Sequence, residues 1–91
     1  MRLSDILQSK AQVKLLEYLI ENRGKVFNQA GLASMLHVSP STVARVIEPL
    51  VKHNILRYER FGKGMKILTL NIEDAKTQAL VEACIKLNSL Q

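Results

Sequence analysis

Hydroxyl and basic side chains gather in the middle of this 91-residue sequence, where they could bind a polyanion. Six basic and two acidic residues lie in residues 45–66, so this segment carries +4 of the formal net charge of +5. Ser39, Ser41 and Thr42 come shortly before it. Such groups bond to phosphate oxygens, and clustered positive charge favours polyanions more than net charge alone does. This part of the chain is therefore our candidate binding surface.

No residues form a recognisable catalytic or metal-binding motif. We find no glycine-rich phosphate loop, no paired-carboxylate motif, and no serine or cysteine nucleophile with a recognisable base. Cys84 is the only cysteine, and His37 and His53 are the only other soft ligands, so neither an internal disulfide nor a zinc site is expected. We expect no enzyme activity, no metal and no cofactor. A pocket for a small-molecule effector leaves little trace in sequence and stays an open question.

Length and composition indicate one small globular domain, with 47% apolar residues and no low-complexity run. A chain of this size buries about 60–65% of its unfolded surface, so pairing with a second copy would add stability. The apolar runs are short, so we expect no membrane span, no secretory signal and a cytoplasmic location. We expect a single domain, residues 1–91, that is mainly α-helical with a small β-hairpin.

Capping residues and apolar spacing predict two helices in the first third of the chain. The first begins at a serine cap, Ser4 or Ser9, and ends at residues 22–24. Its apolar side chains at helical spacing are Val13, Leu15, Leu16, Leu19 and Ile20. After a short extended piece, "KVFN", Asn28 caps a second helix over residues 29–37. We expect its inward side chains to be Leu32, Met35 and Leu36.

The third predicted helix contains both prolines of the chain. Ser39 is placed as its N-cap and Pro40 at its first position, where a proline is tolerated. Steps of 100° put Val43, Val46, Ile47, Leu50 and Asn54 on one side and leave Ser41, Thr42, Arg45, Glu48, Pro49 and Lys52 on the other. Pro49 deletes the hydrogen bond to the carbonyl of Arg45 at a cost of roughly 3 kcal/mol, so a kink is expected. The kink is either tolerated near the helix end or used to fit a curved surface.

Two strand-like runs follow, "ILRYER" and "MKILTLN", joined by "FGKG", whose glycines suit a tight hairpin. We expect Leu56 and Tyr58 of the first run to share a buried face with Leu68 and Leu70 of the second.

A last helix is predicted over residues 72–91, with Asn71 as its cap and two acidic residues in its first turn. Its apolar residues cover an arc too broad for one contact, as do those of the first helix. Both helices are therefore expected to pack against a second subunit as well as their own core.

The order of three helices and a hairpin resembles the winged helix-turn-helix fold. More specifically, "ILQSKAQVKLLEYLIEN" and "LASMLHVSPSTVARVIEPLVKHNIL" are similar to small archaeal-type transcription regulators related to the MarR and ArsR groups. The resemblance covers residues 6–71 and is most specific in "LHVSPSTVARVIEPL". The family usually has glycine where this chain has His37 and Asn54, two residue types that tolerate a positive φ. The interior Pro49 is a further departure.

The resemblance implies a winged-helix core at residues 4–71 and a dimerisation helix at residues 72–91. Residues 39–54 would be the recognition helix in the major groove of DNA, and residues 57–66 the wing on the backbone or minor groove. In that placement Ser41 and Thr42 point outward without a capping role, and Arg45 contacts either a guanine, a phosphate or Glu48. The expected DNA-binding residues are Gln29, Ser39, Ser41, Thr42, Arg45, Lys52, Arg60, Lys63 and Lys66, with Ser39 acting mainly as a cap. Leu80, Cys84 and Leu87 are expected at the dimer interface.

These features predict a homodimeric, sequence-specific regulator of transcription that binds double-stranded DNA, most simply a nucleoid-associated repressor. Two alternatives stay open. One is a weakly specific DNA-coating or partition protein, which would bind unrelated duplexes alike. The other is a winged helix that binds another protein, which would leave the basic face without a DNA partner.

Overall fold

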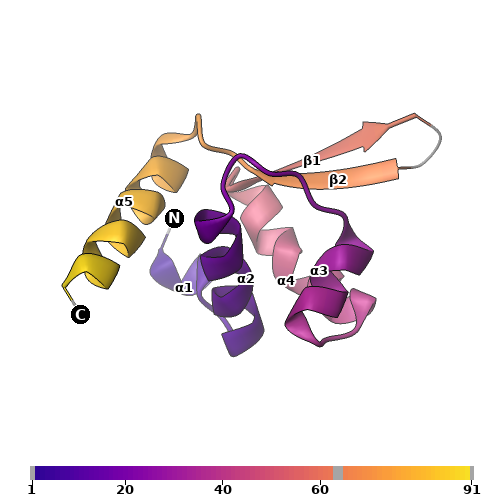
Figure 1. Cartoon of the computed structure of the whole chain (residues 1–91), viewed down its shortest axis with the longest axis horizontal. Helices are drawn as coiled ribbons and strands as arrows, with labels where there is room; N and C mark the ends of the chain where they lie inside the picture. Colours follow the sequence, from indigo (N-terminus) through magenta and orange to yellow (C-terminus); the bar gives the residue numbers. More distant parts are fainter. Residues whose placement is uncertain (1, 63–64, 91) are drawn as a thin grey trace.

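The computed structural model describes residues 2–62 and 65–90. It confirms the predicted fold class, a mainly α-helical winged helix-turn-helix with a two-stranded hairpin and a C-terminal helix (Figure 1). The elements are α1 (Leu3–Ile6), α2 (Lys10–Glu21), α3 (Gln29–Leu36), α4 (Pro40–Lys52), β1 (Leu56–Phe61), β2 (Met65–Leu70) and α5 (Ala75–Ser89). The hairpin projects away from the helical body, and α5 lies on the opposite side of the molecule (Figure 1).

The helix caps follow the sequence closely. The side chains of Ser9, Asn28 and Ser39 accept hydrogen bonds from backbone amides in the first turns of α2, α3 and α4. His37 and Asn54 adopt left-handed backbone conformations with φ of 57° and 63°. This agrees with the sequence analysis, which found these residues where related proteins usually have glycine.

The end of α4 is fixed by a Schellman motif around Asn54. The helix continues through Pro49 but stops at Lys52, two residues before the predicted end. The amide of Ile55 donates to the carbonyl of Leu50 over 2.8 Å, and the amide of Asn54 donates to that of Val51 over 3.1 Å. The Leu50 and Ile55 side chains are both fully buried, so the turn that aims the chain into β1 is anchored in the core.

The core lies between α2, α3, α4 and the base of the hairpin. Its fully buried apolar side chains are Ile6, Leu15, Leu19, Leu32, Val43, Leu50, Ile55, Leu56 and Leu68. The predicted extended piece before α3 forms a β-bridge, in which Phe27 and Leu68 exchange hydrogen bonds of 2.8 and 2.6 Å. The apolar side chains that helix α5 contributes, such as Leu80 and Cys84, are only partly buried, whereas its polar Thr77 is fully buried. The elements from α1 to β2 therefore build the apolar core largely without α5.

Three further expectations about side-chain placement or helix limits were wrong. Met35 is 50% exposed, and Ala33 takes the inward position instead. Tyr58 is 36% exposed because the hairpin extends beyond the helices that cover its base. Helix α5 begins at Ala75 rather than Ile72, because Asp74 is its cap.

Asn71 and Asp74 have separate roles at the start of α5. The amide of Asn71 donates to the carbonyl of Ile55 and its side chain to the carbonyl of Asn54, so Asn71 closes the hairpin instead of capping the helix. Burial tends to raise the pKa of Asp74, but hydrogen bonds from the Thr77 amide, Lys76 and the Thr77 hydroxyl outweigh it and hold the pKa below its ordinary value. The carboxylate is thereby kept charged as the cap.

Candidate nucleic-acid interface

The outward face of α4 carries the polar side chains that the helical spacing predicted. Val43, Val46, Ile47 and Leu50 are buried, which turns the opposite side of the helix to solvent. On that side Ser41, Arg45, Glu48 and Lys52 are exposed and Thr42 is half-buried. The amphipathic pattern of α4 therefore positions its predicted contact residues.

The hydroxyl groups at the start of α4 form one cluster. Ser39 Oγ accepts a hydrogen bond from the Thr42 amide, which confirms its capping role. The same atom lies 3.0 Å from Ser41 Oγ and 2.9 Å from Thr42 Oγ1. The expectation that Ser41 and Thr42 have no part in the cap was therefore wrong, because both hydroxyls hydrogen-bond to the capping oxygen.

Gln29 connects the two helices of the helix-turn-helix unit. Its Nε2 donates to the carbonyl oxygen of Pro40 over 2.9 Å, which ties the start of α3 to the start of α4. The side chain thus has a structural contact that the sequence did not predict, beside the phosphate contact that we expected of it.

An open hollow separates α4 from the hairpin, and we call it the wing hollow. It brings together three predicted residues, Gln29, Lys52 and Lys66, and adds Glu48 and Tyr58. The Lys66 ammonium lies 5.9 Å from the centre of the Tyr58 ring, within the range of a cation–π contact. Sequence reasoning missed Tyr58 here because it placed that ring in the core.

One face of the hairpin changes from apolar at its base to basic toward its outer end. The register pairs Leu56 with Leu70, Tyr58 with Leu68, and Arg60 with Lys66, and paired residues share a face. The Leu56–Leu70 pair is buried, whereas Arg60 and Lys66 are exposed. Two positive charges thus lie directly opposite each other on the face that lines the wing hollow. The predicted contact residue Lys63 lies outside the described residues.

Arg45 lies on the other flank of α4. It lines a second hollow, between α1 and α4, together with Asp5, Glu48, Pro49 and His53. His53 Nε2 lies 4.0 Å from a carboxylate oxygen of Asp5 across this hollow. Within residues 2–62 and 65–90, no ion pair joins Arg45 to Glu48, which was one of its predicted alternatives.

Gln12 is a buried polar residue that the sequence analysis did not single out. Its Oε1 accepts from the Gln8 amide over 2.6 Å, and its Nε2 donates to the Val46 carbonyl over 3.2 Å. Gln12 therefore links the start of α2 to the middle of α4. Its helical spacing of three, four and seven residues from Leu15, Leu16 and Leu19 was the signal that could have identified it.

The three predicted dimerisation residues lie in one apolar groove, which we call the α5 groove. Leu80, Cys84 and Leu87 of α5 line it opposite Leu3, Leu7 and Leu16 of the N-terminal helices. Leu3 and Leu87 are each 64% exposed. Helix α5, which forms one side of the groove, lies on the side of the molecule opposite the projecting end of the hairpin (Figure 1).

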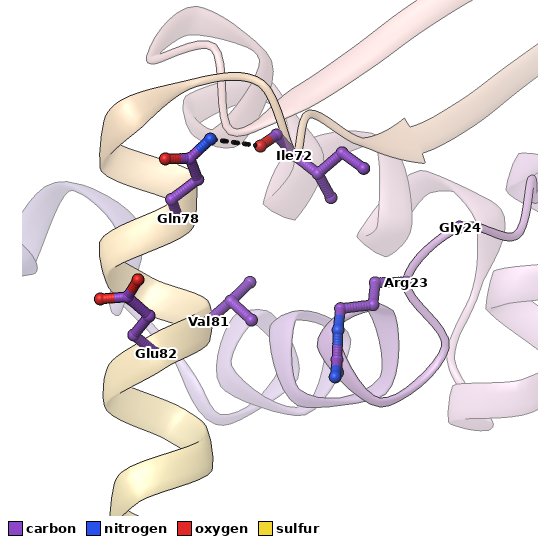
Figure 2. Close-up of a pocket in the computed structure, with 6 residues that line it drawn as sticks. All are labelled: Arg23, Gly24, Ile72, Gln78, Val81 and Glu82. Carbon is purple, nitrogen blue, oxygen red and sulfur yellow. Dashed lines mark hydrogen bonds between the residues drawn. The ribbon is translucent and has the colours of Figure 1, made fainter.

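A further hollow lies between the end of α2 and α5 (Figure 2). Two of its polar side chains are engaged locally, because Arg23 Nη1 donates to the Ile20 carbonyl and Gln78 Nε2 donates to the Ile72 carbonyl. The Ile72 and Val81 side chains form its apolar part (Figure 2).

Neither a metal cluster nor a membrane helix is found in the described part of the chain. Residues 2–62 and 65–90 contain no group of three or more His, Cys, Asp or Glu side chains placed to hold a metal ion. Over the same ranges, no helix is both long and apolar enough to cross a membrane.

The chain matches no protein-family model and no curated protein. Several solved structures nevertheless superimpose on most of it. HlyU from Vibrio cholerae N16961 is 16% identical, with a TM-score of 0.72 over 93% of this chain and 86% of that chain. The AntR antimony-specific transcriptional repressor is 21% identical, with a TM-score of 0.69 over 96% of this chain and 74% of that chain.

A third structure, a mutant of the type III plasmid segregation protein TubR, spans both chains almost completely. It is 18% identical, with a TM-score of 0.68 over 100% of this chain and 96% of that chain. At these identities the similarity establishes a shared fold, the winged helix-turn-helix of these proteins.

Proposed function

We propose that this protein is a homodimeric transcription regulator, and not an enzyme, that binds double-stranded DNA through α4 and the hairpin. In this proposal α4 enters the major groove and the hairpin contacts the adjacent backbone or minor groove. Binding across a promoter would exclude other proteins from it, so the simplest regulatory role is repression in the cytoplasm, at the nucleoid.

The observation that carries the proposal is the direct pairing of Arg60 with Lys66 across the hairpin. Like charges directly opposite each other destabilise a hairpin. A phosphate backbone lying along this face would remove the repulsion and release counterions from the DNA. Lys52, which lines the wing hollow beside Lys66, extends the positive surface back to α4.

The start of α4 offers groups suited to DNA on the other side of the same surface. Exposed Ser41 lies at the N-terminus of α4, where the partial positive charge of the helix dipole favours phosphate oxygens. The Arg45 guanidinium can bridge O6 and N7 of a guanine, which is worth roughly 1–3 kcal/mol of discrimination. These groups would give the surface both affinity and sequence preference.

A second copy of the chain would cover the α5 groove. The groove is lined by exposed leucines from α1 and α5, and such a surface is stabilised when a partner removes it from water. A two-fold dimer built here would leave both hairpins free. The two copies of α4 could then meet successive major grooves about 34–36 Å apart.

A DNA-coating or segregation role is the second candidate, and one observation favours it. The TubR structure matches this chain over nearly the full length of both proteins. This role would use the same face of α4 and the hairpin with little preference among sequences.

Fluorescence anisotropy of a labelled random duplex, titrated at several salt concentrations, tests the proposal. Host genomic fragments are then added as competitors. Binding that weakens steeply with salt and is displaced best by a few fragments supports a specific regulator. Equal displacement by every fragment would assign the coating role instead. No binding at low salt would overturn both, and would direct the search to a protein partner.

A further inference from the structure

Glu48 is an acidic residue in the middle of the basic surface formed by α4 and the hairpin. It lies one turn after Arg45 and one turn before Lys52 on the exposed side of α4. It lines both the wing hollow and the hollow between α1 and α4, as Lys52 does one turn later. A side chain that borders both hollows lies on the ridge of the helix, between its two flanks.

No ion pair within residues 2–62 and 65–90 engages the carboxylate of Glu48. It lies in the C-terminal half of α4, where the helix dipole does not favour a negative charge. The side chain also contributes nothing to the core, because it is exposed.

A carboxylate at this place would oppose binding if the surface only neutralised phosphates. Positive residues on this surface attract the DNA backbone, whereas a negative residue among them repels it. The repulsion is offset when the carboxylate lies deep in the major groove and accepts a hydrogen bond from a base. Cytosine offers such a donor, because its N4 amino group points into the major groove and pairs with Glu or Asp.

We infer that Glu48 is a specificity-determining residue that selects a cytosine through this amino group. The inference rests on the proposed function, and it assigns one base preference to one side chain. Lys66 then holds a phosphate on the wing side, and Lys52, which lines both hollows, holds one a turn beyond Glu48. Arg45 lies on the flank opposite the wing. Glu48 disfavours thymine and guanine at its position because their carbonyl oxygens would repel the carboxylate. It disfavours adenine because the N7 acceptor lies beside the N6 amino group.

The test uses the best genomic fragment from the competition experiment and a set of duplexes in which each base pair is replaced in turn. We expect the wild-type protein to lose about tenfold in affinity when one particular C·G pair is replaced. Glu48→Ala should lose that preference while keeping the others, and it should bind random duplexes more tightly because a repulsive charge is gone. Glu48→Gln should gain affinity for adenine at the same position, since an amide pairs with adenine.

Glu82→Ala is the matched control, because Glu82 is an exposed residue of α5 away from this surface. It should leave every base preference unchanged. If Glu48→Ala shifts affinity for all duplexes equally and keeps every preference, the inference is overturned while DNA binding stands. If the wild-type protein binds all duplexes alike, no base is read and the inference is overturned as well. Absence of wild-type binding would instead overturn the proposed function itself.

Discussion

Gln12 and Val46 are joined by a buried hydrogen bond, in which Nε2 of Gln12 donates to the carbonyl oxygen of Val46 over 3.2 Å. Gln12 is 1% exposed, and its Oε1 also accepts from the amide of Gln8. One side chain thus satisfies two backbone groups that belong to different parts of the chain. This bond fixes the middle of α4 against the start of α2, and so helps to set how α4 presents its outer face.

Replacing Gln12 by leucine should lower the free energy of unfolding by about 1–3 kcal/mol, because the buried bond to the Val46 carbonyl and the part-buried bond to the Gln8 amide are both lost. Urea unfolding followed by circular dichroism measures this. Gln78→Leu is the control, since Gln78 is exposed and bonds only within its own segment. Equal midpoints for the two variants would show that the buried bond contributes no more than a surface one.

Pro49→Ala should stabilise the protein by up to about 3 kcal/mol, because alanine restores the hydrogen bond to the carbonyl of Arg45 and favours the helix. Thermal unfolding gives this value. We expect the affinity of this variant for the selected DNA fragment to equal that of the wild type, because a proline that is only tolerated near the helix end has no part in binding. A stabler variant with weaker binding would show that the bend shapes the fit to DNA.

Arg45→Ala and Lys66→Ala should weaken DNA binding in different ways. Loss of Lys66 should lower the affinity for all duplexes alike and reduce the slope of log K against log salt by about 1. Loss of Arg45 should relax the sequence preference at one position. Lys14→Ala is the control, because it removes one positive charge from the exposed side of α2. It should change neither the salt dependence of binding nor the sequence preference. Identical behaviour of the Arg45 and Lys66 variants would remove the distinction between a base contact and a phosphate contact.

Leu87→Asp should convert the dimer into a monomer, because it places a charge in the α5 groove where a second copy would bury it. Size-exclusion chromatography with light scattering measures the mass in solution. Ile72→Asp is the control, since Ile72 is 52% exposed and lies in the other hollow of α5. A wild-type monomer, or a Leu87→Asp dimer, would contradict the proposed interface.

The local signals in the sequence predicted most elements because each depends on few residues. Ser39 followed by Pro40 gave the start of α4, and His37 and Asn54 took the left-handed conformations of their positions. The four-residue helix α1 was missed because it is too short to show a helical period. The start of α5 was misplaced because Asn71 and Asp74 are both suitable caps, and only the tertiary hydrogen bonds of Asn71 decide between them.

The candidate interface was predicted less completely than the fold. Its basic residues follow from charge and spacing, but which of them share a surface depends on how far the hairpin extends beyond the helices. Because the hairpin extends beyond the helices, Tyr58 is exposed and Lys66 lines the same hollow as Lys52. The alternation of residues along the strand does not indicate how far the hairpin extends. The role of Gln29 in joining α3 to Pro40 was equally hidden, because its partner is a backbone carbonyl eleven residues away.

The most direct test of the account is a titration of ¹⁵N-labelled protein with duplex DNA at low salt, followed by amide chemical shifts. Because α4 and the hairpin are proposed to contact DNA, we predict the largest shifts in residues 39–52 and 56–70. The amides of α5 should move little. No shifts at low salt, or shifts confined to α5, would contradict the proposal that this surface binds DNA.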